Sequence, residues 1–345
     1  MILLPKQLLL SLLAMSVLSG VAAQTTAAQT PGTPMPGAPM PAAPMPATPM
    51  PVPYDTTLFQ IIRSGNAVAL QKKLERGADP NAIADGQSAL MTATLFGSSD
   101  EMRLLLLKGA NPNYADPDSL TALWLAVPDS AKTALLLDRG ADPNMLSRDH
   151  YSALIKLVNF PGTTPLLQLL IAKGADPKKA APDNMLLYEA ASSGDTALLG
   201  LLLRMGFRPN DTAAFGDYPL NSALSFRTFA TLKMLIDSGA KVNITLPSNV
   251  FPNLRGMTPL MFAADDDDER SFFYLLDHGA DPNAKSVSGY TALMFLQLAE
   301  TDHPAMTQAL LAHGADPKQK DINGERPYDM ALRKGNVRSA QLLKQ

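Results

Sequence analysis

The pentapeptide GADPN at residues 77–81 decides the fold, because related pentapeptides return seven more times along the chain. These pentads begin at Gly109, Gly140, Gly174, Gly206, Gly239, Gly279 and Gly314. A catalytic acid is not needed eight times, so the pentad is interpreted as architecture and Asp79 as a turn residue. Its glycine permits the left-handed turn that ends a helix, and Asp-Pro then directs the chain into an extended turn. The asparagine that follows can bond local backbone.

The segments between pentads predict two helices each. Most of them begin with a tripeptide such as Thr258-Pro259-Leu260 and end in a leucine-rich run such as MRLLLLKG at 102–109. Threonine or serine can cap the free N–H groups of a first helix, and proline at its first position loses no bond. The apolar residues recur at helical spacing, so each helix pair exposes a face that it cannot bury alone. Stacked pairs would bury these faces.

The spacing of the pentad glycines identifies the repeat. A period near 33 residues, with a turn and two helices, is that of ankyrin repeats, and residues 54–345 resemble this family. The resemblance implies an all-α ankyrin-repeat solenoid of about nine helix-turn-helix repeats with β-turn fingers. The histidine of the family's usual TPLH motif is missing throughout, so its hydrogen-bond network is not expected here. The polar first and last units are expected to cap the solenoid.

The first residues predict export. Lys6 precedes an apolar run from Leu8 to Val21, and small residues end at Ala23. This pattern is typical of a secretory signal peptide at 1–23, cleaved after Ala23, which places the protein in the periplasm or outside the cell and favours a bacterium. The apolar run is short for a membrane span, so no span is expected after cleavage. Retention of the signal as an anchor stays an alternative.

Residues 24–53 predict a linker. Proline recurs throughout this Pro/Met-rich stretch, which favours disorder or polyproline II and cannot build a core. Its methionines, Met35, Met40, Met45 and Met50, raise the alternative of a Cu(I) site, since thioethers are soft ligands. A five-residue step places successive methionines on different faces of a three-residue-per-turn helix, so no metal is expected. The domain expectation is therefore signal at 1–23, linker at 24–53 and ankyrin repeats at 54–345.

The remaining residues offer little chemistry. A net charge of −3 and the lack of a basic face argue against nucleic acid, and the absence of Cys excludes disulfides and thiol nucleophiles. No nucleotide-binding, hydrolase or metalloprotease motif occurs. The acidic run Asp265–Glu269 fails as a calcium loop, because its sixth position is Arg270 and its twelfth is Leu276. No catalytic, cofactor-binding or metal-binding residue is therefore assigned, and no cofactor is expected.

The inner faces of the last three repeats predict a partner site. In the family pattern, the residue after the TPLH histidine points into the concave groove, and here Phe262, Phe295 and Met330 take that place. With Tyr290 on the adjoining finger, they would form an exposed apolar stripe of the kind that marks an interface. The alternative is that Leu296, in place of the usual alanine, tilts the helices and buries the phenylalanines as core.

A second partner site is predicted in a long finger. The interval from Gly239 to Gly279 is 40 residues, so the finger carries extra residues at Ile244–Arg255, including Asn249 and Phe251. Loops of this kind project from the scaffold and carry function. A tolerated insertion without function is the alternative.

Together these features predict an exported protein–protein binding module: a scaffold, inhibitor or protective partner of an envelope or extracellular protein. A monomer is expected, with its protein partner on the concave groove and the finger loops. The alternatives are a metal-handling or enzymatic protein with a site in irregular repeat positions, and a structural envelope spacer. A metal or substrate that binds only the folded state would raise the melting temperature of the protein. This effect would separate a metal-handling or enzymatic protein from a protein-binding module.

Overall fold

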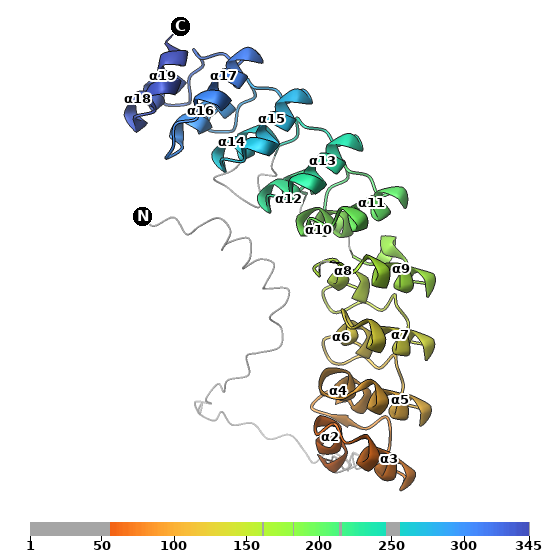
Figure 1. The fold of residues 1–345 in the computed structure, drawn as a ribbon. Coiled ribbons are helices and arrows are strands. Elements are labelled where there is room, and N and C mark those ends of the chain that lie inside the picture. Colours follow the sequence, from red (N-terminus) through yellow and green to blue (C-terminus); the bar gives the residue numbers. More distant parts are fainter. Residues whose placement is uncertain (1–55, 161, 182, 214–215, 246–255, 345) are drawn as a thin grey trace, which may run out of the picture. The chain divides into compact units, whose positions relative to one another are not determined.

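The described part of the chain is built almost entirely from paired helices. A computed structural model describes residues 56–160, 162–181, 183–213, 216–245 and 256–344. Nine helix pairs occur within these residues, each an inner helix followed by an outer helix that packs against it. Figure 1 shows the pairs following one another in chain order. The expectation of about nine helix-turn-helix repeats is confirmed.

The bounds of the helices follow the repeat. The inner helices are α2 (Thr56–Arg63), α4 (Ala89–Phe96), α6 (Ala122–Ala126), α8 (Ala153–Leu157), α10 (Met185–Ser193), α12 (Pro219–Ser225), α14 (Pro259–Asp265), α16 (Ala292–Leu298) and α18 (Pro327–Lys334). The outer helices are α3 (Ala67–Glu75), α5 (Ser99–Leu107), α7 (Ser130–Asp138), α9 (Thr164–Ala172), α11 (Thr196–Arg204), α13 (Phe229–Asp237), α15 (Glu269–Asp277), α17 (Pro304–Ala312) and α19 (Val337–Leu343).

The starts of the inner helices are set by the capping residues that the sequence indicated. Ser88, Thr121 and Thr291 each accept a hydrogen bond from the backbone N–H three residues later, at the starts of α4, α6 and α16. Prolines open α12, α14 and α18, where the missing N–H costs no helical bond. The hydroxyl caps satisfy donors that a helix start would otherwise leave free.

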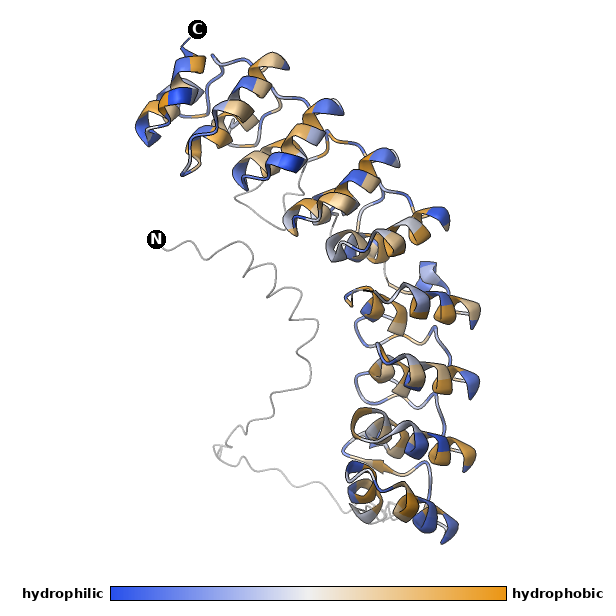
Figure 2. Cartoon of the chain, viewed as in Figure 1, coloured by the Kyte–Doolittle hydropathy of each residue, from blue (hydrophilic) through white to orange (hydrophobic). Residues whose placement is uncertain are grey.

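The core lies between successive helices. Each inner helix packs on the next inner helix, and most outer helices pack on the next outer helix. Leucines dominate the contacts, and Leu105, Leu136, Leu202 and Leu275 on outer helices are fully buried. Figure 2 shows hydrophobic residues concentrated within the helices and polar residues at the ends of the outer helices. Each repeat is therefore stabilised mainly by its two neighbours.

Backbone bridges hold several of the fingers that join the repeats within the described residues. In the first finger, β1 (Ile83–Ala84) and β2 (Gln87–Ser88) form a small antiparallel ladder in which Ile83 pairs with Ser88. A single bridge between Ala115 and Thr121 closes the second finger, and another between Asp183 and Ala213 joins two successive fingers. These turns project the residues between the repeats away from the helices.

The pentads form an asparagine ladder that runs from repeat to repeat. The pentad aspartate bonds locally, as expected: Asp79 Oδ1 accepts from the Asn81 N–H at 2.8 Å. The asparagine does not bond locally. The Asn81 carboxamide donates to the Gly109 carbonyl of the next repeat at 3.1 Å and accepts from the Asn111 N–H at 2.7 Å. The asparagine ladder therefore links neighbouring repeats through pairs of bonds.

Six asparagines make this pair of bonds, each to the next pentad glycine and to the N–H two residues beyond it. They are Asn81, Asn113, Asn144, Asn210, Asn243 and Asn283, and they bind the carbonyls of Gly109, Gly140, Gly174, Gly239, Gly279 and Gly314 in that order. A hydrogen bond of this kind contributes about 0.5–1.5 kcal/mol to stability.

Candidate protein-binding surface

The expected apolar stripe on the inner helices is not exposed. Phe262 in α14 is 6% exposed and Met330 in α18 is fully buried. Because α16 packs directly on both α14 and α18, neighbouring helices cover Phe262 and Met330. The prediction of an exposed Phe262–Phe295–Met330 stripe is therefore wrong, and the alternative of core residues describes Phe262 and Met330. Leu296, next to Phe295, is also fully buried.

Phe295 and Tyr290 remain partly exposed and lie together. The two rings have centroids 5.5 Å apart and are tilted by 45° to each other. Tyr290 lies at the end of its finger, where its N–H donates to the Ser286 hydroxyl at 3.1 Å and its carbonyl accepts from the Ser286 N–H at 2.9 Å. Burial raises the pKa of the Tyr290 phenol, which stays neutral. This pair is the part of the predicted site that the structure brings together at the surface.

The other two predicted partner residues, Asn249 and Phe251, lie in 246–255, outside the described residues. Their role in a recognition loop stays a prediction.

Two exposed aliphatic side chains on the last fingers were missed by the sequence reasoning. Val287 is 62% exposed and Ile322 is 72% exposed. The two fingers are neighbours, since the Ile322 N–H donates to the Ser288 carbonyl at 3.4 Å. Gly289 has φ +75° and lies so close to the next finger that a Cβ there would be 3.1 Å from the Ile322 nitrogen. Branched aliphatic residues thus stand at adjacent fingertips.

A signal for these residues was present in the sequence. Each lies two positions before a finger glycine, in VSG at 287–289 and ING at 322–324. The equivalent residue in the first finger is Ala84, before Gly86. Turn tips generally lie on the surface, so a branched aliphatic residue in this register is expected to be largely exposed. We call Val287, Ile322, Tyr290 and Phe295 the C-terminal finger surface.

The middle of the inner-helix face carries charged residues without charged partners. The Lys156 Nζ atom in α8 donates to the Trp124 backbone carbonyl at 2.9 Å. It also lies 4.2 Å from the centroid of the Trp124 indole ring. Burial lowers the pKa of Lys156 to about 8 and raises the pKa of Glu189 in α10 to about 7. Within the described part of the chain, neither side chain forms an ion pair. Both charges are therefore costly at neutral pH.

A buried polar group continues this region into α12. Asp217 accepts from the Asn221 carboxamide at 2.7 Å and from the Tyr188 hydroxyl at 3.4 Å. Burial raises the pKa of Asp217 and, together with the Asp217 charge, that of the Tyr188 phenol. These bonds satisfy the groups internally, so they hold the fifth and sixth repeats together.

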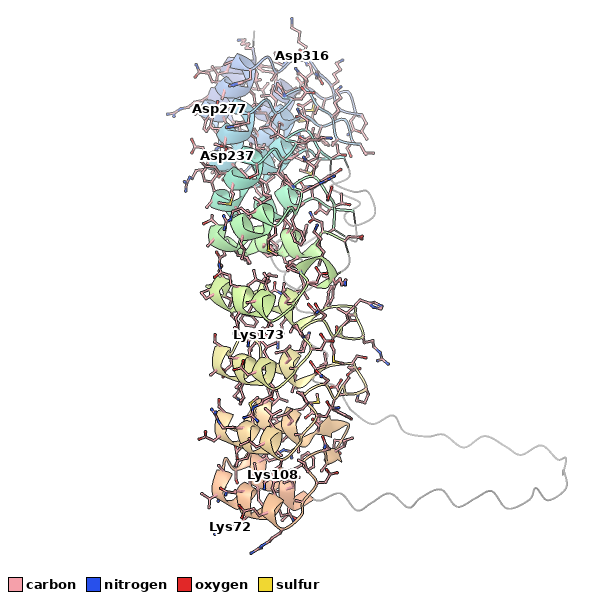
Figure 3. All side chains as sticks on the ribbon, turned by 90° about the vertical axis from the view of Figure 1, so that its right-hand side faces the viewer. Lys72, Lys108, Lys173, Asp237, Asp277 and Asp316 are labelled. Carbon is pink, nitrogen blue, oxygen red and sulfur yellow. The ribbon has the colours of Figure 1, made fainter. Side chains whose placement is uncertain are left out.

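The outer side of the repeats is polar and locally paired. Figure 3 labels six charged residues in the last turns of outer helices or in the segments that follow them: Lys72, Lys108, Lys173, Asp237, Asp277 and Asp316. The positive charge of a lysine at a helix C-terminus interacts favourably with the helix dipole. Lys173 also forms an ion pair with Asp138 at 2.8 Å. Asp237 opposes the dipole but is bound by Lys233 at 2.8 Å and by the Tyr274 hydroxyl. Two of the six labelled charges, Lys173 and Asp237, are therefore held in surface ion pairs.

The acidic run and two of the histidines lie at the ends of outer helices. The acidic run lies between α14 and α15, where Asp268 accepts from the Ser271 N–H at 3.2 Å and so caps α15. His278 and His313 follow outer helices and their Nδ1 atoms lie 2.8 and 2.9 Å from the Tyr274 and Ala309 carbonyls. Among the described residues no three metal-ligating side chains gather, and none of the helices is long and apolar enough to cross a membrane.

Repeats of this geometry, with paired helices and turn fingers, define a class of interaction scaffold. The family model for ankyrin repeats matches residues 58–147, 187–286 and 260–345. The chain belongs to the ankyrin-repeat family, whose members generally act as protein–protein interaction modules. The family match leaves residues 148–186 uncovered.

Known relatives match only parts of the chain. The rat cyclin-dependent kinase 4 inhibitor B is 39% identical over 67 residues, which is 19% of this chain and 52% of the inhibitor. A putative ankyrin repeat protein of fowlpox virus is 27% identical over 203 residues, or 56% of this chain and 38% of the viral protein. The mouse 2-5A-dependent ribonuclease is 35% identical over 74 residues, 21% of this chain and 10% of that enzyme. The chain thus spans about half the length of the inhibitor that it matches.

Proposed function

We propose that this protein is an exported, monomeric ankyrin module that binds another protein through the C-terminal finger surface. The observation that carries the proposal is the pair of exposed aliphatic residues, Val287 and Ile322, on adjacent fingertips beside Tyr290 and Phe295. Exposed apolar patches mark interaction sites, and tyrosine is enriched among the residues that dominate binding energy at protein interfaces. Export rests on the signal-like residues 1–23. A scaffold, inhibitor or protective role for an envelope or extracellular partner is consistent with this surface.

The relatives support a binding role without naming the partner. The rat, mouse, bovine and human relatives are inhibitors of a kinase by name, so a matched ankyrin region can serve in a protein that inhibits another. Only this mode of action, inhibition of one protein by another, is carried over to the present chain. The partner itself is defined by chemistry: an apolar surface that covers the two fingertips and the tyrosine ring.

The double substitution Val287→Ser and Ile322→Ser tests the proposal. We expect the variant to lose about 2 kcal/mol or more of binding free energy, roughly thirtyfold in Kd, because two aliphatic side chains would no longer be buried against the partner. Its melting temperature should hardly change, since both side chains are exposed. The measurement is quantitative recovery of the partner from the envelope and extracellular fractions, followed by titration of that partner.

The matched control is Val68→Ser with Val337→Ser. These two valines are similarly exposed but lie on α3 and α19. Partner affinity should survive this change. Equal binding by the wild type and the fingertip variant would overturn the proposal, as would equal losses in the two double variants.

A further inference from the structure

The asparagine ladder is interrupted once within the described repeats, at the fourth pentad. Lys178 stands there in place of asparagine. Its backbone takes the usual turn, since the Lys178 N–H donates to Asp176 Oδ1 at 3.0 Å, as the Asn81 N–H does to Asp79. A lysine side chain has three donors and no acceptor, so it cannot make the pair of bonds that a carboxamide makes. The last pentad also ends in lysine, Lys318, but no further pentad follows it.

The interruption leaves two backbone groups open. By the register of the asparagine ladder, the missing asparagine would bind the Gly206 carbonyl and the Arg208 N–H. Counting only the described residues, neither group has a hydrogen-bond partner. Each of the six other junctions places a carboxamide on the equivalent pair, with N···O distances of 2.7 to 3.1 Å. The other junctions therefore show that a carboxamide fits a carbonyl and an N–H placed in this way.

A cavity of about 820 Å³ lies at the same place. Lys178, Gly206 and Arg208 all line it, together with Asn184 and Asp211. Asn184 fixes one wall, because its side-chain amide donates to the Arg208 carbonyl at 3.2 Å and to the Asp211 carbonyl at 2.7 Å. Sites for small ligands typically have volumes of about 300–1,000 Å³. There is room here for a polar side chain and part of the chain that carries it.

The repeats are also loosely joined here. Of all successive outer helices, α9 and α11 have the least contact, and α8 and α10 have the least among the inner helices. The internal segment that the family match leaves uncovered, 148–186, ends at this junction. Four charged residues, Lys178, Asp183, Arg208 and Asp211, are exposed around the cavity, and in the described chain none of them is in an ion pair. The cavity is therefore open and polar.

We infer that this cavity binds a primary carboxamide, the side chain of an asparagine or glutamine on a polypeptide partner. A primary carboxamide presents its carbonyl and one N–H on the same side, so it can accept from the Arg208 N–H and donate to the Gly206 carbonyl together. A trans peptide group presents these atoms on opposite sides, and a carboxylate has no donor. The bound carboxamide would complete the asparagine ladder from outside the chain.

This site is separate from the C-terminal finger surface, and each can fail without the other. The experiment uses the full chain labelled with [15N]arginine, so that the Arg208 amide is followed directly by NMR. The probe is N-acetyl-asparagine methylamide, with the aspartate and alanine analogues as controls. All three carry the same two peptide groups and differ only in the side chain. We expect a saturable shift of the Arg208 amide with the asparagine compound and no comparable shift with the other two.

The variant Lys178→Asn provides the decisive comparison. An asparagine at 178 should occupy the Gly206 and Arg208 groups itself, raise the melting temperature and abolish the response to the asparagine compound. Lys318→Asn is the matched control, because it makes the same change in a pentad that no later pentad follows, and it should keep the response. An unmoved Arg208 amide, an equal response to the alanine compound, or a response that survives Lys178→Asn would overturn the inference. Loss of the response in Lys318→Asn would do the same.

Discussion

Replacing Phe262 by alanine is expected to lower the free energy of unfolding by about 3–5 kcal/mol. The side chain is 6% exposed and belongs to the core between α14 and its neighbours. Its removal leaves a cavity that the packed helices can only partly close. Urea unfolding followed by circular dichroism measures the change, and the C-terminal repeats should unfold first, since each repeat depends on its neighbours.

The matched variant is Phe295→Ala, at the equivalent position of the next repeat. Phe295 is partly exposed and packs on Tyr290, so its replacement should cost clearly less stability and should weaken partner binding instead. A small loss of stability in Phe262→Ala, combined with a large loss of binding, would contradict the core role of Phe262. It would support the exposed stripe expected from the sequence.

Glu189 is expected to make the protein less stable as the pH rises towards neutrality. Burial raises the pKa of Glu189 from an ordinary 4.5 to about 7, so the folded state holds a proton that the unfolded state has released between these values. The stabilisation is complete below about pH 4.5 and is lost as the pH rises through about 7. The loss is about 3 kcal/mol, at about 1.36 kcal/mol for each of the roughly 2.5 pH units of the shift.

Glu189→Gln tests this directly, because glutamine has the same size and does not titrate. The difference in unfolding free energy between variant and wild type should grow in favour of the variant from about pH 5 to about pH 7.5. Lys156, with its pKa lowered to about 8, changes stability mainly above this range and is common to both proteins. A difference that stays constant with pH would show that Glu189 is not held in an apolar environment.

Much of the fold could be predicted because the same local sequence signals recur in nearly every repeat. The pentad glycines, the Ser and Thr caps and the spacing of the leucines each depend on near neighbours in sequence. Thr164-Pro165-Leu166 shows how the register resolves ambiguity: it resembles a repeat start, yet the period places it on a second helix, and α9 begins at Thr164. Local signals repeated in register were enough for the architecture.

The site was harder to predict because exposure depends on neighbouring repeats. Phe262, Phe295 and Met330 share one position in the repeat, but the packing of α14, α16 and α18 covers the first and last and leaves the second partly open. The asparagines illustrate the same limit. Their chemistry suggested a local turn bond, whereas their partners lie about one repeat further along the chain.

The central claim is that a protein partner docks on the C-terminal fingertips, and site-specific photo-crosslinking tests it most directly. A photoreactive phenylalanine derivative is placed at position 287 in one protein and at position 68 in another, each produced in the cells from which the chain comes. Both positions are exposed valines, one on a C-terminal fingertip and one on an outer helix of the first repeat. We expect a discrete crosslinked species from position 287 and none from position 68. Crosslinking from position 68 alone, or from neither position, would contradict it.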